Sequence, residues 1–197
     1  MFLLRPPTPD ALHRIVAELD GAPLTYDEVG ATRPAATGDP VAPLPSGYRH
    51  QRAAAELGTG GPAWAAAVDG LRTWQMHRRS GFTVVPGDPP IAEGATVLSV
   101  IPLAVVRLLA GCRITWTVDD GVRFGFGYGT LPLHPARGEE AFVVARTPDD
   151  RVTARIVAFS SPAHPLVRLG GPVAARQQAR ATRGYLDALR AHVAAAI

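Results

Sequence analysis

Hydrophobic residues recur along this chain with two different periods. In the segments 9–20 and 62–79 they follow helical spacing of three and four residues, between residues 82 and 160 they alternate as in strands, and after Gly171 helical spacing returns. This order predicts two helices, then a run of antiparallel strands, then a long C-terminal helix.

The first predicted helix begins at Thr8-Pro9-Asp10, which supplies a capping hydroxyl, a proline at the first helical position and an acid in the first turn. It should end at Gly21. We interpret residues 1–22 as an N-terminal helical extension and residues 23–197 as a single domain. Within that domain, the pattern predicts a short strand over 24–29 and a loop over 30–47. Residues 48–57 fit either an edge strand or a helical turn, and we favour the strand.

A second helix is predicted from Gly60-Gly61-Pro62 to Arg79, with Gly81 after it. Six later segments alternate as strands: 82–85, 95–101, 113–118, 123–131, 139–146 and 152–160. Residues 103–110 fit either a further strand or a helical turn. Long twisted sheets curl, and a helix packs inside the curl. We therefore expect an α+β fold, a curved antiparallel sheet of about seven strands wrapped around the C-terminal helix, which resembles the helix-grip fold of START-related and Bet v 1-like proteins.

Composition narrows the class of protein. The chain is 47% hydrophobic and 19% charged with a net charge of +3, which is typical of a globular domain. A single cysteine excludes a disulfide framework and favours a reducing, cytoplasmic setting. The 20 basic residues, all arginine, barely exceed the 17 acidic ones, which argues against nucleic acid as a partner. The longest apolar run, 97–112, contains Pro102 and Arg107 and is too short to span a bilayer.

The segment from Phe124 to Thr130 alternates aromatic residues with glycines. One face of this strand carries rings, and the other is nearly bare at Gly125, Gly127 and Gly129. Glycine weakens a strand, so three in alternation indicate that something approaches the backbone closely. Two interpretations stand: a helix or sharp bend lies there, or the bare face borders a ligand cavity.

Glu139 and Glu140 follow a proline-rich loop and enter an apolar strand. Neighbouring residues of a strand point to opposite faces, so at most one of the two faces the interior. A buried carboxylate needs a partner, which His134, Arg137 or Arg155 could supply. This arrangement is either an acid–base pair that holds the loop or a general acid/base pair of His134 and a glutamate.

The chain also resembles a known family. Tyr128-Gly129-Thr130-Leu131-Pro132, His134-Pro135 and the run from Gly138 to Val144 resemble the signature of the DUF1990 family, and the segments 24–30, 57–60 and 158–162 fit it too. The resemblance covers nearly all of the chain beyond residue 20. Leu133 and Ala136 depart from it, because the family usually has glycine and glutamate there. It implies the fold and an uncharacterised function, and it brings no catalytic residue.

From these patterns we expect the protein to bind a small, mostly apolar ligand in an internal cavity. This requires an internal void larger than one or two water molecules. Alternation does not decide which strand faces turn inward, because both faces are apolar. The candidate ligand-binding residues are Trp74, Trp116, Tyr128, His134, Glu140, Arg155, Gln178 and Tyr185.

Two alternatives remain open. The first is a hydrolase or lyase that acts in the same cavity through His134 and Glu140. The second is an interaction module that uses an arginine stripe on the C-terminal helix, formed by Arg176, Arg180, Arg183 and Arg190. The six histidines are scattered and Cys112 is alone, so we expect no metal site and no cofactor. The ligand's identity and the oligomeric state do not follow from the sequence.

Overall fold

One curved antiparallel sheet organises the chain. The computed structural model describes residues 2–3, 7–103, 105–163 and 171–197, with the backbone alone for residues 2 and 171–179. In these ranges the strands follow the order β2-β8-β7-β6-β5-β4-β3, and β1 pairs with β5. The strands are β1 (Phe2–Leu3), β2 (Arg49–Thr59), β3 (Thr83–Val85), β4 (Thr96–Leu103), β5 (Val106–Asp119), β6 (Arg123–Thr130), β7 (Ala136–Arg146) and β8 (Arg151–Pro162).

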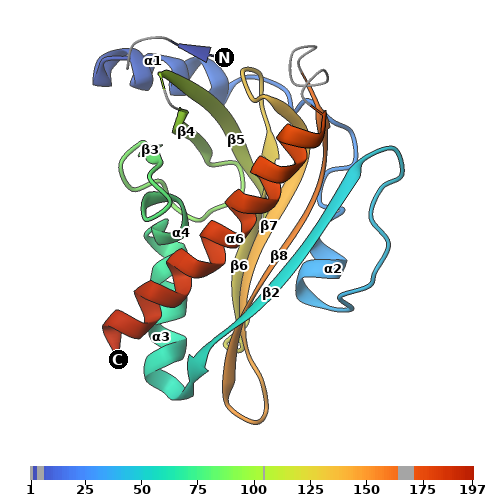
Figure 1. Cartoon of the computed structure of the whole chain (residues 1–197), viewed down its shortest axis with the longest axis vertical. Coiled ribbons are helices and arrows are strands. Elements are labelled where there is room, and N and C mark those ends of the chain that lie inside the picture. Colours follow the sequence, from blue (N-terminus) through green and yellow to red (C-terminus); the bar gives the residue numbers. More distant parts are fainter. Residues whose placement is uncertain (1, 4–6, 104, 164–170) are drawn as a thin grey trace.

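Helices lie on both faces of the sheet. They are α1 (Pro9–Asp20), α2 (Arg33–Thr37), α3 (Gly60–Arg72), α4 (Gln75–Arg78) and α6 (Gly171–Ala196). Figure 1 shows α6 crossing the inner face of the curve, while α2 lies on the opposite side of β8 and β2, at the outer face. This is the predicted α+β arrangement of a curved sheet around a long C-terminal helix. Within the described ranges, no helix combines the length and apolar character that a bilayer crossing requires.

The main hydrophobic core lies between the inner face of the sheet and α3, α4 and α6. Its largest fully buried side chains include Trp74, Phe126 and Phe142. From α6, Tyr185 and Leu189 are buried, whereas Arg180, Arg183 and Arg190 are exposed, as the predicted amphipathic pattern requires. The backbone of Arg176 and Gln178 lies in α6, and their side chains fall outside the described part of the structure.

The N-terminal helix forms as its sequence signals predict. The Thr8 hydroxyl accepts a hydrogen bond from Ala11 N at 3.3 Å, and Gly21 follows the last turn. Leu12 and Leu19 pack this helix onto a second core cluster that contains Leu98, Leu109 and Leu131. The short strand β1, which the sequence pattern did not reveal, pairs Phe2 with Leu108.

Two predicted boundaries are wrong. The helix predicted over 60–79 is broken at Trp74, whose backbone is left-handed with φ of 58°. This break directs the indole into the core, where its N–H donates to the Pro89 carbonyl at 2.9 Å. Residues 106–110 and 113–118 belong to the single strand β5, which is continuous through Gly111. A Cβ at Gly111 would lie 2.7 Å from Leu19, so this glycine provides space rather than a turn.

The segment 24–29 is not a strand, and the predicted loop 30–47 contains the short helix α2. Thr25 N donates to the Thr130 carbonyl at 3.0 Å, and the residues after it turn over the outer face of the sheet. The edge strand predicted over 48–57 is confirmed as β2, which pairs with β8.

The glycines of β6 admit bulky side chains from the outer face. A Cβ on Gly127 would lie 2.2 Å from the Trp116 indole nitrogen, and a Cβ on Gly129 would lie 2.1 Å from the Tyr26 hydroxyl. The predicted close approach is therefore confirmed, and side chains of the protein itself occupy the bare face. The interpretation of that face as the border of a ligand cavity is wrong at these two positions.

Candidate functional site

The two adjacent glutamates of β7 face opposite sides of the sheet, as alternation predicts. Glu139 pairs across the ladder with Gly129 and Phe159, on the side covered by residues 26–38. Glu140 pairs with Tyr128 and Ala158, on the side covered by α6. The two carboxylates therefore have separate environments and separate roles.

Glu139 fastens the loop that covers the outer face. Its side chain is 2% exposed and accepts hydrogen bonds from the Tyr26 hydroxyl and Gly30 N, both at 2.8 Å. It also accepts from Thr32 N and Oγ1 at 3.0 and 2.6 Å, and from Thr115 Oγ1 at 3.0 Å. Neutral donors, rather than the predicted His134, Arg137 or Arg155, therefore satisfy this buried carboxylate.

Glu140 ends a hydrogen-bonded chain on the inner face. The Tyr128 hydroxyl donates to Glu140 Oε2 at 3.1 Å and lies 3.1 Å from His77 Nε2. When Tyr128 donates to an ionised Glu140, its oxygen accepts the Nε2 proton of His77. The Nδ1 atom of His77 is then an acceptor, and this buried atom has no hydrogen-bond partner in the described residues.

Burial determines the protonation states of these hydrogen-bonded side chains. It raises the pKa of Glu140 to about 7, against the opposing effect of the Tyr128 hydrogen bond. Burial also lowers the pKa of His77 to about 3, so the imidazole is neutral at physiological pH. The pKa values of Tyr128 and Tyr185 are raised well above the ordinary range, first by burial and then by the charge of Glu140. Glu140 is therefore the member of this group that changes charge near neutral pH.

Aromatic rings pack around the hydrogen-bonded side chains of His77 and Tyr128. The Tyr185 ring of α6 lies 4.9 Å from His77 and 5.4 Å from Phe142, measured between centroids. The Tyr128 and Phe142 rings are 5.5 Å apart. Glu140 nevertheless remains partly exposed, so the end of the inner face where it lies is accessible from outside.

A second polar side chain shares the cross-strand row of Glu140. Gln51 of β2 pairs with Ala158 of β8, which in turn pairs with Glu140 of β7. The buried Oε1 atom of Gln51 has no hydrogen-bond partner in the described residues. Ala158, which lies between Gln51 and Glu140 in this row, carries only a methyl group and is 2% exposed. We call Gln51, His77, Tyr128, Glu140 and Tyr185 the inner polar cluster.

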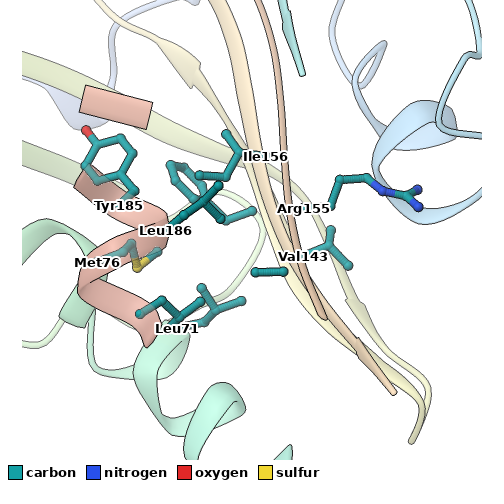
Figure 2. A pocket seen from close by; sticks show the side chains of 10 residues that line it. Leu71, Met76, Val143, Arg155, Ile156, Tyr185 and Leu186 are labelled. Atoms are coloured by element: carbon teal, nitrogen blue, oxygen red, sulfur yellow. The ribbon is translucent and has the colours of Figure 1, made fainter. Parts of the chain in front are cut away.

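Deeper between α6 and the sheet, the described residues bound a void of about 10 Å³. Figure 2 shows the side chains that line it, among them Leu71, Met76, Ile156 and Leu186. Such a volume holds about one water molecule. The requirement for a larger preformed cavity is therefore not met, because the aromatic side chains of the core fill the curve of the sheet.

The structure brings only part of the predicted ligand-binding set together. Tyr128, Glu140 and Tyr185 meet on the inner face, and Trp74 packs beside Tyr128. Trp116 lies on the outer face, where its indole donates to Thr32 Oγ1 at 3.1 Å.

Two further members of that set lie elsewhere. Figure 2 shows Arg155 directed away from α6, and its Nη1 donates to the carbonyls of Ala35 and Gly38 at 3.1 and 3.0 Å. His134 Nδ1 accepts from Ala136 N at 3.0 Å within its own loop, and burial lowers the pKa of His134 to about 4. In the described residues no hydrogen bond joins His134 to Glu140, so these two do not form the predicted acid–base pair.

His77 and Gln51 were missed by sequence reasoning. His77 lies in a segment predicted as a continuous helix, and the break at Trp74 that turns it inward has no sequence signal. Gln51 lies in a segment with only a weak edge-strand pattern. It shares a cross-strand row with Glu140 because it pairs with Ala158, which is 107 residues later in the sequence, and no local pattern reveals such a pairing.

A larger hollow of about 370 Å³ lies on the surface between the loop 88–91 and the end of β5. Its charged groups pair with one another: Arg72 contacts Asp119 at 3.1 Å and lies over the Phe124 ring at 4.7 Å. Asp88 contacts Arg78 at 2.8 Å. Because these groups are exposed and already paired, the hollow offers less to a ligand than the inner polar cluster does.

The chain belongs to the DUF1990 family, a domain of unknown function, whose model matches residues 25–188. A UPF0548 protein of Deinococcus radiodurans is 32% identical over 94% of this chain and 95% of its own length. A UPF0548 protein of Dictyostelium discoideum is 29% identical over 88% of this chain and 87% of its own. The predicted resemblance is thus confirmed.

Solved structures with little sequence similarity share the fold. A hypothetical protein of Helicobacter pylori aligns with a TM-score of 0.56 and 11% identity, over 87% of this chain and 99% of its own. A START superfamily protein of Mycobacterium smegmatis aligns with a TM-score of 0.52 and 8% identity, over 75% of this chain and 97% of its own. These likenesses support the helix-grip architecture.

Proposed function

We propose that this protein binds a small, mostly apolar molecule against the inner face of its sheet, at the end formed by the inner polar cluster. Glu140 and Tyr128 hold the polar group of the ligand, and the apolar part lies against the aromatic rings beside α6. The observation that supports this is the hydrogen-bonded chain of His77, Tyr128 and Glu140 at a partly exposed end of an otherwise apolar interior.

The hydrogen-bonded groups of His77, Tyr128 and Glu140 lower the stability of the fold, because they lie in a largely apolar interior. A carboxylate among aromatic rings without a cation is disfavoured relative to an apolar residue of similar volume. The buried Nδ1 of His77 adds an unmade hydrogen bond. Residues that weaken a fold in this way are concentrated at functional sites, and a strongly shifted pKa in such a group is a further mark of them.

The filled interior constrains how binding occurs. Because the void beside α6 is about 10 Å³, a ligand larger than one water molecule needs α6 and the core rings to move apart. The apolar part of the ligand then replaces contacts between α6 and the sheet. Binding to the folded state alone raises the melting temperature, and the increase grows with the logarithm of the free ligand concentration once this exceeds the dissociation constant.

The test combines native mass spectrometry of the freshly purified protein with thermal-shift screening of small apolar compounds. We expect a co-purified compound, or screening hits whose stabilisation is lost in Glu140→Gln and kept in Glu56→Gln, a matched change at an exposed position of β2. A screen in which Glu140→Gln responds as the wild type does would contradict the assignment of this site.

An enzyme is the second candidate, and one observation favours it. Glu140 has a pKa of about 7, which suits a general acid/base. The hydrolase or lyase proposed from the sequence would then use Glu140 with Tyr128 and His77 rather than with His134. The distinguishing result is turnover of a bound compound that is abolished by Glu140→Gln while binding persists.

A further inference from the structure

We propose that the polar group bound at the inner polar cluster is a protonated primary amine carried on an apolar body. This inference rests on the proposed function, and it specifies the chemical class of the ligand. Three observations support it: the absence of a cationic partner for Glu140 in the described part of the chain, the aromatic rings near it, and the acceptor atoms in its cross-strand row.

Glu140 has no cationic partner among the described residues. The chain contains no lysine, and the described arginines of the neighbouring strands turn elsewhere. Arg155 binds the carbonyls beneath α2, and Arg113 binds the carbonyls of Leu19, Asp20 and Ala22. His77 stays neutral because burial lowers its pKa. A ligand that brings a positive charge therefore supplies a counter-ion that the described residues do not provide.

The rings around Glu140 favour the same charge. Tyr128, Phe142 and Tyr185 lie with centroids 5.4–5.5 Å apart along the path from β6 to α6. The face of an aromatic ring attracts a cation within about 6 Å, and the attraction grows when water is excluded. A carboxylate ligand would meet both the charge of Glu140 and the negative faces of these rings, so it is disfavoured.

The neighbouring polar atoms are acceptors. Oε1 of Gln51 is buried without a donor, and no described residue donates to the Oε1 atom of Glu140. Gln51 and Glu140 lie on strands separated by β8, about 10 Å apart at the backbone by the usual strand spacing. In register, both residues pair with Ala158 of β8, so its methyl group lies between them on the same face of the sheet. An ammonium group placed there donates N–H bonds to both, which a quaternary ammonium cannot do.

Isothermal titration calorimetry with one alkyl chain and four head groups tests the inference. The probes are hexylammonium, hexyltrimethylammonium, hexanol and hexanoate, at about pH 8 where Glu140 is largely ionised. We expect hexylammonium to bind about tenfold tighter than hexanol and hexanoate, and tighter than the quaternary analogue. Glu140→Gln should remove the preference over hexanol, and Gln51→Leu should narrow the gap to the quaternary analogue. Glu56→Gln should leave all four affinities unchanged.

The outcomes separate the two proposals. If hexanol or hexanoate binds wild type as tightly as hexylammonium, or if Glu140→Gln keeps the preference, the amine assignment is overturned and small-molecule binding stands. If none of the four probes binds wild type and none shifts its melting temperature, the binding function itself is overturned. Folding of each variant is checked by circular dichroism, so that a lost preference reflects the site.

Discussion

Replacing Glu140 by glutamine should change how stability depends on pH. Glutamine keeps the shape of the side chain and its ability to accept from the Tyr128 hydroxyl, and it removes the titrating proton. Burial raises the pKa of Glu140 from 4.5 to about 7. Between these values the folded state holds a proton that the unfolded chain has released, so this group stabilises the fold fully below pH 4.5 and loses its contribution as pH rises through 7.

The size of the effect follows from the same values. Each pH unit in this window costs about 1.4 kcal/mol of unfolding free energy. From pH 4.5 to above pH 7 the total is at most about 3.4 kcal/mol, and partial exposure of Glu140 reduces it. We therefore compare the free energy of unfolding of Glu140→Gln with that of wild type at each pH. The variant's value minus the wild-type value should be larger at pH 8 than at pH 4.5 by roughly 2 to 3 kcal/mol.

Urea unfolding of both proteins from about pH 4.5 to pH 8.5 measures this difference. His77 contributes in the opposite sense, because its lowered pKa of about 3 makes the fold lose stability as pH falls below 6.5. That contribution is present in both proteins and cancels in the comparison. A difference between the two proteins that stays constant with pH would refute the buried, inward position of Glu140.

Three further outcomes are expected. Gly127→Ala should lower stability by about 1–3 kcal/mol in urea unfolding, because its Cβ meets the Trp116 indole at 2.2 Å; an unchanged midpoint would contradict this packing. Glu139→Ala should cost more, about 3–5 kcal/mol, because it leaves several buried donors without an acceptor, and a loss below 1 kcal/mol would show that the loop is fastened otherwise. His77→Phe removes the stability loss that His77 contributes as pH falls from about 6.5 to 4, so the variant should gain stability relative to wild type over this range, and a difference that stays constant with pH would mean that His77 is not held neutral.

Local signals in the sequence determined much of the fold. Thr8-Pro9-Asp10 and Gly21 bounded the first helix because caps act through neighbouring residues. Alternation located most strands for the same reason. The errors fell where distant contacts decide: Trp74 adopts a left-handed backbone to reach the core, and Gly111 is small to admit Leu19 rather than to form a turn.

The site was only partly predictable. Alternation placed Glu139 and Glu140 on opposite faces, and it could not say which faced inward because both faces of β7 are covered by apolar residues. Residues 26–38 cover the outer face of β7 and donate hydrogen bonds to Glu139. Their composition is that of a loop, so the sequence does not indicate that they pack on the sheet. His77 joins Tyr128 only through the break before α4, so no local pattern could pair them.

The most direct test of the account is a carbon-13 NMR titration of the Glu140 side-chain carboxyl, with and without hexylammonium. We expect a pKa of about 7 for Glu140 in the free protein and a lower value when the ammonium is bound, because the cation stabilises the ionised form. A carboxyl that titrates near 4.5, with no response to hexylammonium, would contradict the central claim.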